Sequence, residues 1–85
     1  MSKNQEIAAR VLKAVGGEGN VNSVVHCATR LRFKLKDENK ADTAALNADP
    51  DVIQVVQSAG QDHVVIGSHV SDVYKDLMAN SGLGN

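Results

Sequence analysis

A short segment in the first third of the chain holds the residues whose chemistry is most distinctive. It runs from His26 to Arg32 (HCATRLR) and contains the only cysteine of the 85 residues, Cys27. A thiol becomes a useful nucleophile when nearby positive charge stabilises its thiolate, and Arg30 and Arg32 supply that charge. A guanidinium fork also matches phosphate oxygens in a way that a lysine ammonium cannot. The segment therefore predicts a nucleophilic cysteine beside a binding site for an oxyanion.

The same segment offers further donors to an anion. A tight connection between two strands exposes backbone N–H groups that no strand pairing uses, and such groups can bind an anion as a nest. The Thr29 hydroxyl adds another donor. Together these groups suit a tetrahedral oxyanion attached to sulfur, which is a phosphocysteine. We expect Cys27 to be the reacting residue, and the expected phosphate-binding residues are Ala28, Thr29, Arg30 and Arg32.

Simpler interpretations of these residues stay open. A lone cysteine is most often a small buried hydrophobic residue, although a place in a turn beside two arginines favours a functional role. A run of alternating cations is by default only a solvated strand face. We keep that interpretation for Lys34 and Lys36 and expect a site role for the two arginines. His26 is interpreted as a surface residue rather than as a general base.

Other candidate residues carry weaker signals. His63 and His69 have no cysteine or carboxylate at metal-ligand spacing, so neither a metal nor another cofactor is expected. Gly60 is interpreted as a turn glycine and not as part of a phosphate loop. The formal net charge of −1 excludes a chain that binds polyanions as a whole.

The elements around Cys27 must place it in a turn. Residues 21–26 are rich in β-formers, and residues 30–36 alternate strictly between apolar and cationic side chains, which predicts a half-buried strand. The short connection between these two strands indicates an antiparallel hairpin. Upstream, residues 5–15 have helical periodicity, with Asn4 as the expected N-cap and Gly16-Gly17 as the stop.

The rest of the chain is expected to form a short helix, two further strands and a last helix. Asp42 is expected to cap a short helix over 43–47, strands are expected at 52–56 and 63–66, and a helix with one apolar stripe is expected at 70–78. The order is α-β-β-α-β-β-α. Paired hairpins with one wet sheet face predict an α+β fold. We expect a two-layer sandwich in which a four-stranded antiparallel sheet carries three helices on one face.

Length and composition fit one small domain. The 85 residues are 42% hydrophobic but have only one tyrosine and one phenylalanine, so the core must be mainly aliphatic. A single cysteine fits a reducing compartment. No apolar run approaches the ~20 residues that cross a bilayer, so no direct membrane insertion is expected. We expect one domain over residues 1–80 and the start of a linker or tail at 81–85.

The chain resembles the IIB domain of the bacterial phosphoenolpyruvate-dependent sugar phosphotransferase system, in its glucose–sucrose–β-glucoside group and nearest to the β-glucoside or trehalose type. The family pattern is Asn, an apolar residue, five residues of any kind, Cys, any residue, Thr, Arg, and then alternating apolar positions up to Asp or Gln. The matching residues here are Asn20, Val21, Cys27, Thr29, Arg30, Leu31, Phe33, Leu35 and Asp37.

The resemblance implies a phosphoryl relay in sugar uptake. Cys27 would accept phosphate from a phosphohistidine on a IIA domain or protein and donate it to a sugar bound by a membrane IIC domain. The sugar would be a β-glucoside, with trehalose or sucrose as alternatives. Thr29, Arg30 and Arg32 match family positions, and the resemblance implies that the two arginines would assist the transfer. The domain would be cytoplasmic and tethered to the inner face of the cell membrane through the IIC domain.

One stretch departs from the family pattern. Relatives often read Gly-Gly-Gln-aromatic-Gln before the last strand, whereas this chain has Ala59, Asp62 and His63 in place of the first Gly, the aromatic and the second Gln. Asp62 would add negative charge if that loop faced the phosphate.

Two other classes of protein stay open. A thiol redox sensor would also need an exposed cysteine, but the chain has no second thiol to resolve a sulfenic acid. A nucleic-acid-binding module could use the basic strand, but such modules interleave exposed aromatics, and Phe33 is expected to face the core. No nucleic-acid partner is therefore expected.

Overall fold

The computed structural model describes residues 3–58, 60–79 and 81. Seven main elements alternate with short connections, and two 3₁₀ turns, η1 (Glu18–Asn20) and η2 (Glu38–Lys40), add to them. The observed order is the expected α-β-β-α-β-β-α. The elements are α1 (Lys3–Ala14), β1 (Val21–His26), β2 (Arg30–Leu35), α2 (Thr43–Ala48), β3 (Gln54–Ser58), β4 (Gln61–Val65) and α3 (Val70–Ala79).

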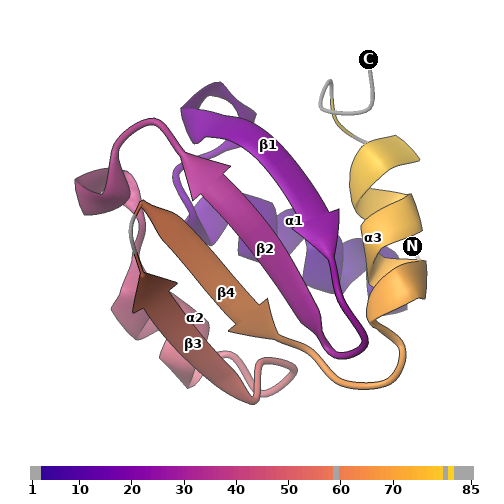
Figure 1. The fold of residues 1–85 in the computed structure, drawn as a ribbon. Helices are drawn as coiled ribbons and strands as arrows, with labels where there is room; N and C mark the ends of the chain where they lie inside the picture. Colours follow the sequence, from indigo (N-terminus) through magenta and orange to yellow (C-terminus); the bar gives the residue numbers. More distant parts are fainter. Residues whose placement is uncertain (1–2, 59, 80, 82–85) are drawn as a thin grey trace.

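The four strands form one antiparallel sheet in the order β1-β2-β4-β3. The basic strand β2 is therefore central and pairs with both β1 and β4 (Figure 1). All three helices lie on one side of the sheet, which confirms the two-layer α+β sandwich (Figure 1). The central place of β2 brings the residues on its wet face next to residues of two other strands.

Alternation along β2 decides which side chains enter the core. Leu31, Phe33 and Leu35 are buried, whereas Arg30 and Lys34 are exposed and Arg32 is partly exposed. The apolar side chains pack against the apolar stripes of α1 and α3, which include Ile7, Val11, Val73 and Leu77. Burial of each such side chain contributes roughly 1.5–3 kcal/mol relative to exposure. The core is aliphatic apart from Phe33, as the composition predicts.

Helix α1 ends at a pair of glycines, as predicted. The Gly17 N–H donates to the Leu12 carbonyl at 2.9 Å and the Gly16 N–H to the Lys13 carbonyl at 3.1 Å, and this pair of bonds is the Schellman motif. Gly16 has a φ of 106°, which L side chains rarely adopt. Asn4 lies inside the helix, so its assignment as the N-cap was wrong.

The buried side chain of Asn20 ties the end of α1 to the end of β2. Its Nδ2 donates to the carbonyls of Val15 and Asp37, both at 2.9 Å, and its Oδ1 accepts from the Asp37 N–H at 3.0 Å. Three hydrogen bonds thus satisfy the whole amide group inside the core. Asn20 therefore has a structural role in the positioning of the strand that carries the arginines.

The second half of the chain differs slightly from the prediction. Helix α2 begins after Asp42, whose carboxylate accepts from the Ala45 N–H at 3.0 Å, so the predicted cap is confirmed. Strands β3 and β4 run over 54–58 and 61–65 instead of 52–56 and 63–66, because the ladder is set by the tight turn at Gly60, with a φ of 82°.

Two further observations concern the extent of the domain. In the described part of the chain, no helix is long and apolar enough to cross a bilayer. The linker expected at residues 81–85 lies outside the described residues except for Ser81.

Candidate functional site

Cys27 lies at the tip of the β1–β2 hairpin, where the chain turns back. Its N–H donates to the Arg30 carbonyl at 2.9 Å, which leaves Ala28 and Thr29 as a two-residue loop. The Thr29 carbonyl accepts from the N–H groups of Ile66 at 2.8 Å and Gly67 at 3.0 Å. The connection that leads from β4 to α3 therefore holds the tip in place.

The loop leaves donors unused. Within the described residues, the N–H groups of Ala28 and Thr29 meet no acceptor, and neither does the Thr29 hydroxyl. All three groups belong to exposed residues. The Cys27 N–H is engaged with Arg30, whereas the N–H groups of Ala28 and Thr29 have no acceptor among the described residues and can serve an anion beside the sulfur.

Arg32 approaches the thiol directly. Its Nη1 lies 3.7 Å from the Sγ of Cys27, in the geometry of a hydrogen bond to sulfur, and Cys27 itself is exposed. The Nε of Arg32 is buried and has no partner among the described residues. One guanidinium therefore touches the sulfur and keeps an unused N–H beside it.

Arg30 lies on the same wet face, one alternation nearer the hairpin tip. It is exposed, and its Cα partner across the sheet is Val65. No hydrogen bond or ion pair of its guanidinium is found in the described ranges. The structure thus brings Arg32 into contact with the thiol, whereas Arg30 lies nearby with its charge uncommitted.

A row of four residues crosses the wet face at the level of Arg32. Val25 on β1, Arg32 on β2, His63 on β4 and Val56 on β3 are successive Cα partners. Burial, followed by the positive charges of Arg32 and Arg30, lowers the pKa of His63, and the nearby Asp62 acts in the opposite direction. His63 is thus a neighbour of Arg32 that sequence reasoning missed, because its position depends on the pairing of β2 with β4.

Asp62 lies on the other face of β4. It is fully buried opposite Phe33, so it adds no charge on the side of the thiol, in contrast to the possibility raised by the sequence. Neither carboxylate oxygen has a hydrogen-bond partner within the described residues; Gln57 approaches from β3 without completing a bond. Burial raises the pKa of Asp62, Gln57 opposes this effect, and the charge of Glu38 adds to it.

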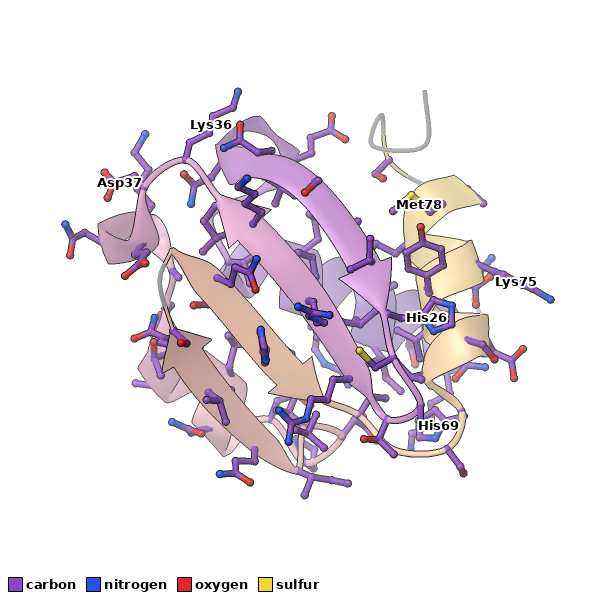
Figure 2. The ribbon with its side chains drawn as sticks, in the orientation of Figure 1. His26, Lys36, Asp37, His69, Lys75 and Met78 are labelled. Carbon is purple, nitrogen blue, oxygen red and sulfur yellow. The ribbon has the colours of Figure 1, made fainter. Side chains whose placement is uncertain are left out.

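His26 is exposed, as expected, but it is not free of contacts. Its ring centroid lies 4.6 Å from that of Tyr74 on α3, and its Nδ1 is 3.1 Å from the Cys27 carbonyl oxygen. Figure 2 shows His26 at the end of β1 beside α3, and Lys36 at the opposite end of the sheet. Lys36 is therefore remote from the hairpin tip, in keeping with a solvated role.

The site is an open surface. A hollow of about 510 Å³ lies instead between α1 and α3, lined by residues that include Leu12, Asp76 and Leu77, and so belongs to the helical layer. No group of three or more metal-ligating side chains occurs in the described part of the chain. An exposed thiol on an open sheet face suits reaction with a group presented by a protein surface.

The geometry defines a small α+β domain with an exposed thiol at an arginine-flanked hairpin tip. The family model described as "phosphotransferase system, EIIB" matches residues 9–42. A crystal structure of one domain of the PTS system IIabc component from Clostridium difficile matches with a TM-score of 0.75 and 30% identity, over 91% of this chain and 77% of that one. The chain therefore belongs to the EIIB family of the phosphotransferase system.

Longer proteins carry similar segments. The chain is 52% identical, over 98% of its length, to the β-glucoside-specific EIIBCA component of Halalkalibacterium halodurans, and 47% identical, over 93%, to that of Dickeya chrysanthemi. It spans only 13% and 12% of these two proteins. Sucrose-specific and trehalose-specific components are among the other similar proteins.

Proposed function

We propose that Cys27 carries a phosphoryl group between two partners in sugar uptake. In the first step the thiolate attacks the phosphorus of a phosphohistidine on a IIA domain or protein. The S–P bond forms, the P–N bond breaks, and the electron pair returns to the donor imidazole. The observation that carries the proposal is the approach of the Arg32 Nη1 to the exposed Cys27 Sγ, at 3.7 Å, because a thiolate and its phosphorylated form both need a nearby cation.

The second step discharges the carrier. A hydroxyl oxygen of a sugar held by a membrane IIC domain attacks the phosphorus, the O–P bond forms, and the S–P bond breaks to return the thiolate. The hydroxyl proton leaves to solvent or to a base of the acceptor. The names of similar proteins favour a β-glucoside as the sugar, with trehalose or sucrose as the alternatives. Through IIC the domain would be tethered to the inner face of the cell membrane.

The residues around the sulfur have separate roles in this scheme. The phosphoryl oxygens would accept hydrogen bonds from the N–H groups of Ala28 and Thr29 and from the Thr29 hydroxyl. No described residue occupies these donors. Arg32 contacts the sulfur, and Arg30 supplies a second fork for the phosphoryl oxygens on the same strand face. Positioning and charge stabilisation by these groups would suffice for a reactive phosphohistidine donor.

The decisive test is to incubate the chain with phosphoenolpyruvate, the general phosphotransfer proteins and a IIA protein, and then to locate phosphate by mass spectrometry. We expect a phosphoryl group on Cys27 that is labile in acid and tolerant of base, and none on the Cys27→Ser variant. The Lys34→Gln variant, altered on the same strand face, is the matched control and should be phosphorylated like the wild type. A glutathione adduct in place of phosphate would favour the redox alternative, and normal sugar phosphorylation by Cys27→Ser would refute the proposal.

A further inference from the structure

Within the described residues, His63 is the imidazole that shares the wet sheet face with the arginine at the thiol. Its Cα pairs with that of Arg32, and Arg32 reaches the Cys27 sulfur at 3.7 Å. We propose that His63 is a further residue of the phosphoryl-transfer site and takes up a proton at Nδ1 when Cys27 becomes phosphorylated. This inference rests on the proposed function and couples the phosphorylation of Cys27 to the uptake of one proton.

The hydrogen bond of His63 decides which nitrogen accepts that proton. Its Nε2 lies 3.1 Å from the Oε1 of Gln61 on the same strand. An amide oxygen only accepts, so Nε2 carries the hydrogen and donates it. The neutral ring therefore keeps its lone pair on Nδ1, for which no partner is found among the described residues. Uptake of a proton at Nδ1 leaves the bond to Gln61 intact.

The charges around His63 are unbalanced while Cys27 carries no phosphate. From β2, Arg30, Arg32 and Lys34 lie on the same face, whereas the neighbours on β3 are the uncharged Gln54, Val56 and Ser58. On its own strand Gln61 and Val65 share the face, and the acid next to it, Asp62, points into the core. Burial and the two arginines lower the pKa of His63, so these surroundings disfavour the protonated ring.

A phosphoryl group on the sulfur reverses this balance. Phosphocysteine brings close to two negative charges to the group that Arg32 touches, by analogy with other phosphorylated side chains. The anion offsets the arginine charges that disfavour the imidazolium, and it attracts a third cation. The transfer itself is unchanged in its bonds: the S–P bond forms, the donor P–N bond breaks, and water supplies the proton that His63 Nδ1 binds.

The first test is an NMR titration of the His63 ring in the 85-residue chain, before and after phosphorylation of Cys27, with the signal assigned by its absence from His63→Gln. We expect His63 to titrate at a higher pH in the phosphorylated protein. A curve that phosphorylation leaves unmoved would overturn the inference while the proposed function stands. Failure of Cys27 to take up phosphate at all would instead defeat the proposed function and this inference with it.

The second test measures the equilibrium of phosphoryl exchange with the IIA protein as a function of pH, relative to two fixed-charge variants. His63→Gln keeps the position neutral and His63→Lys keeps it cationic. The wild-type exchange constant is divided by the constant of each variant, and the titration of the IIA donor cancels because the donor is the same in both. We expect the wild-type constant to fall relative to His63→Lys, by up to about tenfold per pH unit, as pH rises through the titration of His63. A ratio that stays flat with pH for both variants would contradict proton uptake at this residue.

Discussion

At the scale of single residues, Arg32 and Arg30 carry the same charge in different surroundings. Arg32 is partly buried in the row between Val25 and His63 and contacts the thiol sulfur, whereas Arg30 is exposed near the hairpin tip. A planar fork held by packing loses little freedom when it binds an oxyanion. The two arginines should therefore differ in how much each contributes to transfer.

Replacement of each arginine by lysine tests this difference. We expect both variants to fold and both to transfer phosphate to sugar more slowly, because a point charge replaces a fork. The loss should be roughly tenfold or more for Arg32→Lys and smaller for Arg30→Lys. The measurement is sugar phosphorylation in a reconstituted transport assay, with Lys34→Gln as the control on the same face. Wild-type turnover by Arg32→Lys would contradict the assignment.

The residues of the hairpin could be read from the sequence because their chemistry and spacing are local. Asp62 and His63 could not. Burial alternates along Gln61 to Val65, and an aspartate occupies one of the inward positions. Aspartate is almost never fully buried unless it is paired, so its residue type alone would place it in solvent. The neighbours of His63 follow from the pairing of β4 with β2, which residues about 30 positions apart in the chain determine.

At the scale of elements, the hairpin tip depends on both ends of the sheet. The connection after β4 holds Thr29, while Asn20 fixes the other end of β2 to the end of α1. The sequence predicted these elements well where a periodic pattern coincided with a stop signal, as in α1 and β2. The prediction placed the start of β3 too early, at the apolar residues Val52 and Ile53. The Ile53 N–H does donate to the Val65 carbonyl, but strand pairing begins one residue later, at Gln54.

Gly16→Ala probes the junction between α1 and β1. A Cβ at this position would lie 2.7 Å from the Asn20 Nδ2 while the backbone keeps a φ of 106°. We expect the free energy of unfolding to fall by about 2 kcal/mol or more, from backbone strain and displacement of the buried amide. Denaturant titration measures it. Gly19→Ala is the matched control: its added Cβ would meet nothing within 4 Å, so a comparable loss there would refute the mechanism.

At the scale of the whole molecule, the sheet divides the domain into a covered face and an open one. Helices bury one side (Figure 1), and the other carries the cations of β2, His63 and the contact of Arg32 with the thiol. The fold class followed from this division, since one strand with alternating cations already implied a wet face. We expect the buried acid Asp62, which lies between the layers, to make the stability of the domain depend on pH.

Asp62→Asn should stabilise the domain at neutral and alkaline pH. Burial raises the pKa of Asp62 in the folded protein, so the folded state binds a proton more tightly than the unfolded chain does. The contribution of Asp62 to stability is therefore fully present below the unfolded pKa of about 3.9 and is lost as pH rises through the folded pKa. Each pKa unit of elevation costs about 1.4 kcal/mol at high pH, and asparagine removes that cost.

Denaturant titrations of wild type and Asp62→Asn at pH 3 and pH 8 measure the effect. The gain should be present at pH 8 and disappear at pH 3. Asp72→Asn provides the contrast, because this exposed acid lies in the first turn of α3, where a negative charge interacts favourably with the helix dipole. Removal of that charge should be slightly destabilising at pH 8. An Asp62→Asn gain that is equal at both pH values would count against ionisation as the cause.

The exposed sulfur of Cys27, at the end of one sheet face, also has a consequence for timing. In the proposed relay, donor and acceptor must each cover the same few residues around Cys27, and two folded surfaces cannot occupy that spot together. The encounters are therefore successive, with release of one protein before arrival of the next. In this relay, the rate at which the phosphorylated domain leaves the donor and binds the acceptor then sets an upper limit on the rate of sugar entry.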